Sequence, residues 1–251
     1  IHTTPGLYIG ATISIHPRFD PVATLAAIEK ERPSLLVLVP ATIGALIQQP
    51  NWQTTDLTSL RIVTTGSSIV PHSLIEAWHD RGVPVIQVYG STETGPVALY
   101  QREEDAMMSV GSTGRGALHT ELRIVDDAGD DVKPGASGEL LLRGPNLFKK
   151  YWKDRSASEE AFEIDWFCTG DIGYRDERGY VFINDRKTDV VISGGENIYP
   201  AELEQVLDGI DGIVEASVVG AADDKWGEIP VAVVVINKKS TITAEEILSA
   251  F

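Results

Sequence analysis

Apolar positions along residues 11–100 alternate between two periods, one typical of buried strands and the other of helices. The run LLVLV (35–39) is continuously apolar, which predicts a strand buried on both faces. PVATLAAIEKER (21–32) has helical spacing, and Pro40 and Pro71 each open a further helix. Alternation of this kind predicts a parallel sheet with helices on both faces. The other predicted strands of this region are 12–15, 60–65 and 83–89.

After Tyr100 the pattern changes to strands joined by turn-rich loops, with a hairpin turn near Asp176–Gly179. This region is predicted to form a small antiparallel sheet. Residues 189–251 contain twelve acidic residues against three lysines, and this change in composition predicts a separate small domain. The predicted elements of that tail are a strand and glycine turn over 190–200, a helix over 201–210, strands over 215–223 and 229–236, and a short amphipathic helix at the end.

Composition narrows the class of protein. The chain has 251 residues, a formal net charge of −16 and 43% hydrophobic residues, which is enough apolar material for a core. The acidic balance argues against a nucleic-acid partner and against an anionic membrane surface. No apolar run is long enough to cross a membrane. Cys168 is the only cysteine, so no intramolecular disulfide forms, and we expect a cytoplasmic protein.

The segment YGSTETGP (89–96) follows a predicted buried strand, where ligand sites form in parallel sheets. Tyr89 offers a flat face for a base, Gly90 permits close backbone approach, and Glu93 offers a hard oxygen suited to Mg²⁺. Hydroxyl groups come from Ser91, Thr92 and Thr94. The alternative is an ordinary polar turn, since a short Gly/Ser/Thr run is a weak signal by itself.

Two later segments carry similar chemistry. Asp171, after an apolar strand, could accept hydrogen bonds from a ribose diol, or it could satisfy backbone amides in a turn. Arg186 could hold a phosphate or ribose, and Gly194–Gly195 could line a narrow channel; the alternative is a solvated surface turn. The five histidines show no metal-ligand spacing, and the sequence has neither GxSxG nor GxxxxGK[ST].

In this order, YGSTETG, WFCTGDIGYRDERGY and DRKTDVVISGGENIYPAELEQVL resemble the AMP-forming adenylate ligase family. That family includes acyl- and aryl-CoA synthetases, luciferases and adenylation domains of peptide synthetases. PRFDPVATLAAIEKERPSLLVLVPA and LRIVTTGSSIVP are also similar to it, so the resemblance spans nearly the whole chain. Gly116, where a proline is usual, is a minor departure.

The resemblance implies a role for each matching residue. Tyr89 would stack on adenine, with Gly66, Ser67, Ser68, Gly90 and Ser91 beside the nucleotide and acyl group. Thr92 would contact phosphates and Glu93 would ligate Mg²⁺. Asp171 would hold the ribose hydroxyl groups, and Arg186 would contact the ribose or phosphate. Lys187, Thr188 and Asp189 would form a hinge, although Thr188 stands where Asp or Lys is more usual. Gly194 and Gly195 would border the coenzyme A channel.

The implied reaction has two steps. With ATP and Mg²⁺, a carboxylic acid is converted to an acyl-adenylate, in which the acyl group is joined to AMP. The acyl group is then transferred to coenzyme A as a thioester. The family's phosphate-gripping loop and C-terminal lysine have no counterpart in this chain. We therefore expect a fragment with little or no activity by itself. Its α/β fold would comprise a partial large domain over 1–187, with a parallel sheet in 1–100 and a β subdomain in 101–187, and a truncated α+β small domain over 188–251.

Three interpretations remain open at this point. The first is a fragment of an acyl-CoA synthetase acting on a fatty or aromatic acid. The second is an adenylation domain that loads a carrier protein, and the third is a non-catalytic protein that binds a nucleotide or acyl ligand. The oligomeric state is open, and the incomplete sheet of the small domain is expected to be mobile or to pair with a neighbouring chain.

Overall fold

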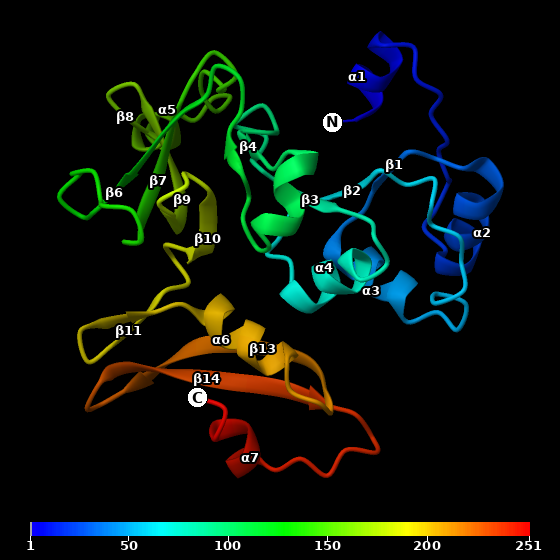
Figure 1. Cartoon of the computed structure of the whole chain (residues 1–251). Helices are drawn as coiled ribbons and strands as arrows, with labels where there is room; N and C mark the ends of the chain where they lie inside the picture. The colour runs from blue at the N-terminus through cyan, green and yellow to red at the C-terminus, as the bar shows by residue number, and fades with distance from the viewer. Residues whose placement is uncertain (1) are drawn as a thin grey trace. The chain divides into compact units, whose positions relative to one another are not determined.

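The computed structural model describes residues 2–251, which divide into two compact units. The first unit extends to Glu121 and also includes Leu142–Glu160. The second consists of Leu122–Leu141 and Ala161–Phe251. Figure 1 shows the elements of both units, coloured along the chain.

The first unit is built on a sheet with strand order β1-β2-β3-β4-β5. β1, β2 and β3 run parallel, and β4 and β5 extend the sheet antiparallel. Its strands are β1 (Leu35–Val37), β2 (Ile62–Thr65), β3 (Val85–Tyr89), β4 (Leu99–Tyr100) and β5 (Arg115–Gly116). Its helices are α1 (Thr3–Tyr8), α2 (Pro21–Glu31), α3 (Pro40–Ile47), α4 (His72–His79), the 3₁₀ helix η1 (Glu103–Met108) and α5 (Arg155–Glu160).

The core of this unit lies between the sheet and helices α2, α3 and α4. α2 begins where Asp20 accepts a hydrogen bond from the Ala23 amide, with proline at the first helical position. Apolar side chains of the three helices pack with Val63 and Val85 of the central strands in one buried cluster. Hydrophobic burial at this interface is what holds the parallel strands in register.

Two expectations about this unit are wrong. Residues 12–15 form no strand, and Ile15 is 74% exposed, because β-propensity in a short run needs a neighbouring strand to pair with. The 35–39 run forms a strand, but it is not buried on both faces. Leu35 and Val37 are 40% and 49% exposed, because β1 is the terminal strand and packs on the core cluster through its other face.

Most of the second sheet belongs to the second unit. Its strand order is β10-β9-β7-β6, with β8 paired to β9. The strands are β6 (Glu121–Val125), β7 (Gly138–Arg143), β8 (Phe162–Glu163), β9 (Trp166–Arg175) and β10 (Val181–Arg186). β9 and β10 form the hairpin predicted around Asp176–Gly179, with an irregular register between Ile183 and Asp185.

The tail forms a third, antiparallel sheet with order β12-β11-β14-β13. Its elements are β11 (Val191–Ser193), β12 (Glu196–Ile198), α6 (Pro200–Asp208), β13 (Ile213–Asp223), β14 (Gly227–Ile236) and α7 (Ala244–Leu248). Leu207 of α6, Val218 of β13 and Ile247 of α7 form a small buried cluster on one face of the sheet. The tail therefore has its own core.

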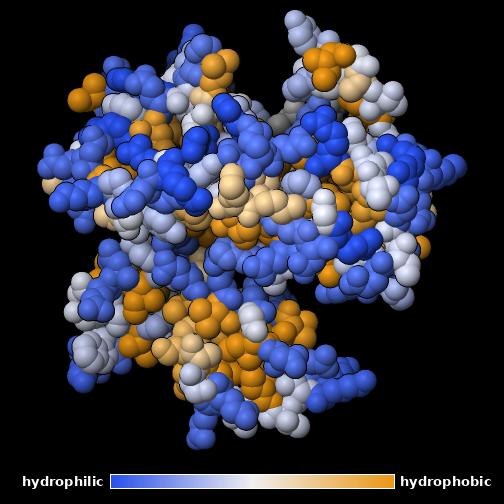
Figure 2. Space-filling view, viewed as in Figure 1, coloured by the Kyte–Doolittle hydropathy of each residue, from blue (hydrophilic) through white to orange (hydrophobic). Residues whose placement is uncertain are grey.

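The opposite face of the β13–β14 hairpin carries apolar side chains that remain exposed. Val219 pairs across the strands with Val231, and these residues are 51% and 38% exposed. Val233 and Val235 continue the same face at 61% and 51%. Figure 2 shows apolar side chains gathered over this part of the tail. Mobility or pairing of this sheet with another chain stays a prediction.

Candidate functional site

The carboxyl edge of the parallel strands brings together two segments predicted to contact a nucleotide. β2 ends at Thr65 and β3 at Tyr89, next to each other in the sheet. A Cβ atom on Gly66 would lie 2.5 Å from the carbonyl oxygen of Val88, so only glycine permits this approach. The Gly66–Ser68 segment therefore lies beside the end of β3.

Buried hydroxyl groups lie at the same edge. The Oγ1 atoms of Thr64 and Thr65 and the Oγ atom of Ser91 are buried, and among the residues that the structure describes they have no hydrogen-bond partner. Buried polar atoms without partners are costly and call for an explanation. These atoms lie below the molecular surface, at the edge of the sheet where ligands bind in parallel α/β folds.

The loop after β3 is a tight turn. The amide of Ser91 donates to Oγ1 of Thr94 at 2.7 Å, and Thr94 is buried. Gly95 has a φ of +70°, and a Cβ there would lie 2.6 Å from the carbonyl oxygen of Asn146. Within this turn Thr92 is exposed and Glu93 is half-buried, so both can reach a ligand from a fixed backbone.

Residues 146–151 pack against this turn and were not predicted to belong to the site. Nδ2 of Asn146 donates to the carbonyl oxygen of Thr94, and the Phe148 amide donates to that of Glu93, both at 2.7 Å. The hydroxyl group of Tyr151 donates to Oε1 of Glu93 at 3.1 Å. Burial, followed by the contact with Glu93, raises the pKa of Tyr151 above its ordinary value, so the phenol is protonated at neutral pH.

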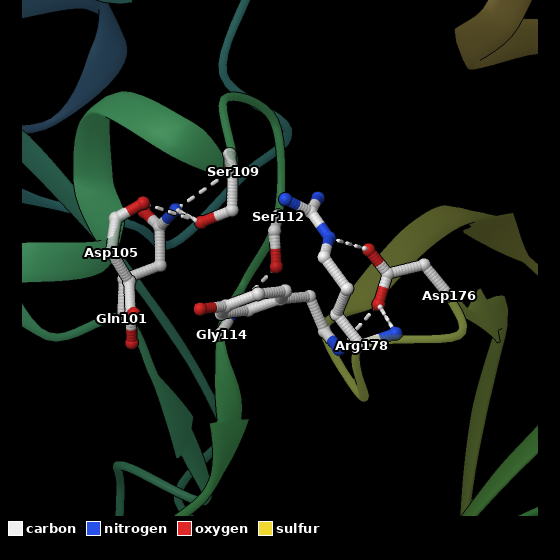
Figure 3. Close-up of polar contacts among 8 residues, drawn as sticks. Gln101, Asp105, Ser109, Ser112, Gly114, Asp176 and Arg178 are labelled. Carbon is white, nitrogen blue, oxygen red and sulfur yellow. Dashed lines mark hydrogen bonds and ion pairs between the residues drawn. The ribbon is translucent and has the colours of Figure 1, made fainter.

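A buried network of hydrogen bonds around the Gln101 side chain lies beside β3. The Gln87 amide donates to Oε1 of Gln101 at 2.8 Å, and Nε2 of Gln101 donates to the carbonyl oxygen and Oγ of Ser109. Figure 3 shows the contact of Gln101 with Ser109, and the hydrogen bond that Oγ of Ser109 donates to the carbonyl oxygen of Asp105. Gln87 and Gln101 are almost fully buried, so the network fixes the backbone of β3 to the segment that follows β4.

In the second unit, Asp171 and Arg186 face each other across β9 and β10. Nε of Arg186 lies 2.8 Å from Oδ1 of Asp171, whose side chain is only 13% exposed. The Asp171 amide donates to Oγ1 of Thr169 at 3.1 Å. The irregular register of β10 lies directly before this pair, as is common where a strand re-aims a functional side chain.

The residues predicted as a hinge follow directly. Nζ of Lys187 lies 2.7 Å from Oε2 of Glu139, and this hydrogen bond is the main cause that raises the pKa of Lys187. The hydroxyl group of Thr188 donates to Asp189 at 2.9 Å. These contacts fix the side chains of Lys187 and Thr188, and the role of the segment as a hinge stays a prediction.

Gly194 lies against the indole ring of Trp226, another residue that the sequence pattern did not single out. A Cβ atom on Gly194 would lie 2.7 Å from the ring, and the Gly194 amide donates to the carbonyl oxygen of Trp226 at 2.9 Å. Gly195, with a φ of +93°, has open space around it. Any side chain at Gly194 would displace the tryptophan.

Tyr89 and Glu93 belong to the first unit, whereas Asp171 and Arg186 belong to the second. Their convergence on one nucleotide stays a prediction. Among residues 2–251 there is no group of three or more His, Cys, Asp or Glu side chains arranged to hold a metal ion. Nor does any helix in this range have the length and apolar character needed to cross a membrane.

These features define an α/β protein whose Gly66–Ser68 and Tyr89–Glu93 segments lie at the carboxyl edge of its parallel strands. A sequence model of the AMP-binding enzymes matches residues 1–152, and that of the AMP-binding enzyme C-terminal domain matches residues 202–250. The chain therefore belongs to the AMP-binding enzyme family, as the sequence motifs predicted.

Among its relatives, the indoleacetate–CoA ligase of Aromatoleum aromaticum is 53% identical over 98% of this chain and 48% of its own length. A feruloyl-CoA synthase of Amycolatopsis is 40% identical over 98% of the chain and 50% of its own length. The chain thus spans about half the length of the curated relatives it matches, which is consistent with the predicted fragment.

Solved structures confirm the predicted fold class. The o-succinylbenzoate CoA synthetase of Bacillus subtilis, in complex with an acyl-adenylate intermediate, matches 98% of this chain and 50% of its own, with a TM-score of 0.89 and 35% identity. ATP-bound MatB of Rhodopseudomonas palustris matches 99% of this chain and 49% of its own, with a TM-score of 0.92 and 32% identity. The fold is that of part of the large domain of adenylate-forming enzymes with part of the small domain.

Proposed function

We propose that the protein containing this chain is an AMP-forming acid–CoA ligase. The observation that carries the proposal is the 53% identity to a CoA ligase along almost the whole chain. In the first step a substrate carboxylate oxygen attacks the α-phosphorus of ATP, the bond to the β-phosphate breaks, and pyrophosphate leaves. In the second step a thiol sulfur attacks the acyl carbonyl, the bond to AMP breaks, and the thiol proton is released.

The nucleotide would be held from both units. In this proposal Tyr89 stacks on adenine beside Gly66, Ser67, Ser68, Gly90 and Ser91, and Thr92 contacts the phosphates. The close approach of Gly66 to β3 supports the first part. Asp171 holds the ribose hydroxyl groups and Arg186 contacts the ribose or phosphate, and their contact across β9 and β10 supports a shared role.

The residues present fit a magnesium ion that accompanies ATP. Mg²⁺ is commonly bound by only one or two carboxylates together with substrate phosphates, so a single half-buried Glu93 is sufficient. The carboxylate is already held by Tyr151, which suits a fixed ligand. The ion would neutralise charge as two anionic groups approach each other.

For the second step we propose coenzyme A as the thiol. Gly194 and Gly195 would border its channel, and Lys187, Thr188 and Asp189 would form the hinge between a large domain ending at 187 and a small domain beginning at 188. A carrier-protein thiol is the alternative acceptor to be tested.

We propose an apolar acid as substrate, aromatic or fatty. Relatives named for indoleacetate, ferulate and long-chain fatty acids support this class. The decisive experiment is ATP–pyrophosphate exchange by the full gene product with indoleacetate, ferulate, a long-chain fatty acid and a polar dicarboxylate. Exchange is expected with one of the first three acids, followed by thioester formation with coenzyme A. Exchange with none of the acids, in a folded protein that binds ATP, would support the non-catalytic alternative.

A further inference from the structure

We infer that Tyr151 is a positioning residue that fixes the carboxylate of Glu93 for the metal–nucleotide complex. The inference rests on the proposed function, because it gives Glu93 the role of a Mg²⁺ ligand. Tyr151 itself would touch neither metal nor substrate. Its contribution is to hold the orientation of the group that does.

The contact is direct and its chemistry is suitable. The Tyr151 hydroxyl group donates to Oε1 of Glu93 at 3.1 Å, across 58 positions of sequence. An ionised carboxylate has only acceptor sites, so a donor on one oxygen restricts rotation of the group. Hydrogen bonds of this kind orient metal-ligating carboxylates, and their loss commonly weakens metal affinity.

Tyr151 is itself held in place by neighbours in the same unit. Its amide donates to Oγ of Ser158 at 2.9 Å, and its ring packs against Phe148 with centroids 4.8 Å apart. Phe148 in turn donates its amide to the carbonyl oxygen of Glu93. One short segment therefore fixes both the backbone and the side chain of Glu93, as a preorganised ligand requires.

The test uses Tyr151→Phe in the full gene product, because this change removes the hydroxyl group and keeps the ring. Calorimetry gives the Kd for ATP with a chelator and with Mg²⁺, and the ratio of the chelator value to the Mg²⁺ value measures the metal's contribution. We expect Tyr151→Phe to reduce that ratio by about tenfold, with metal-free ATP binding and the midpoint of thermal unfolding unchanged. Tyr100→Phe is the matched control, since Tyr100 lies in the same unit and is 36% exposed, and it should leave the ratio unchanged.

Glu93→Gln separates the inference from the proposed function on which it rests. If Glu93→Gln lowers the ratio and Tyr151→Phe does not, the positioning role is overturned while the metal role of Glu93 stands. If neither variant changes the ratio, both assignments fall. If Tyr151→Phe weakens ATP binding equally with and without Mg²⁺ and also lowers the midpoint of thermal unfolding, Tyr151 is a packing residue and the inference is overturned.

Discussion

At the residue scale, His79 gives the first unit a dependence on pH. Its Nε2 atom accepts the amide hydrogen of Val85 at 3.1 Å, at the start of β3. Burial lowers the pKa of His79, although the negative charges of the nearby Glu76 and Asp80 act in the opposite direction. The folded protein therefore favours the neutral ring, which can accept this hydrogen bond.

We predict that the free energy of unfolding falls as pH drops below the ordinary histidine pKa of 6.5, because the unfolded chain then takes up the proton more readily. Above that pH, His79 makes no pH-dependent contribution. Urea unfolding at about pH 7.5 and about pH 5.5 measures the difference. His79→Gln should reduce it, whereas His72→Gln, at an exposed position of the same helix, serves as control. An equal loss in wild type and His79→Gln would contradict the assignment.

Single residues also show the limit of reasoning from residue types. Glu93 and Asp171 were singled out because each carboxylate follows a predicted strand. Their partners were not predicted: Tyr151 carries no motif, and the pairing of Arg186 with Asp171 depends on the register of β9 and β10. A hydrogen bond across 58 positions leaves no periodic signal in the sequence.

At the scale of elements, the Gln101 network joins β3, β4 and η1. Gln101 replaced by leucine would leave the buried Gln87 amide without its acceptor and would remove both hydrogen bonds from Gln101 to Ser109. The Ser109 carbonyl oxygen would keep only the bond from the Ser112 amide. We predict a loss of about 2–4 kcal/mol in the free energy of unfolding, since each buried polar group left without a partner costs about 1–3 kcal/mol. Urea unfolding of Gln101→Leu measures it.

Gln53→Leu is the matched control, because Gln53 is exposed. Its stability should change by less than about 0.5 kcal/mol. Similar values for the two variants would mean that the network contributes no more than an exposed glutamine does.

Helices and long strands were well predicted, because their periodic apolar positions coincide with the faces that become buried. α2 begins and ends within one residue of its predicted range, and β9 and β10 form the expected hairpin. The 12–15 strand and the burial of both faces of β1 were predicted wrongly, and the short helices α1, η1 and α5 were not predicted. The two wrong predictions depend on which element lies alongside, a property that a local apolar run does not encode.

At the scale of the whole molecule, the chain spans about half of its relatives, and the phosphate-gripping loop and C-terminal lysine that the family resemblance implies have no counterpart in its sequence. We predict that the isolated 251-residue chain shows little or no ATP–pyrophosphate exchange, while the full gene product is active. Exchange assays on both, with circular dichroism to establish that the isolated chain is folded, check this. Exchange by the folded chain at the rate of the full gene product would contradict it.

The sequence alone determined the family, the α/β class and the order of the main strands and helices, because the motifs are long, ordered and placed at the ends of apolar runs. Only the tertiary structure decided which side chains meet. It showed that Tyr151 donates a hydrogen bond to Glu93, that Gly66 lies close to the Val88 backbone, and that the Gln101 side chain accepts a hydrogen bond from β3. The physical reason is that element formation follows local periodicity, whereas contacts between distant segments depend on sheet order, strand register and the close approach of backbones.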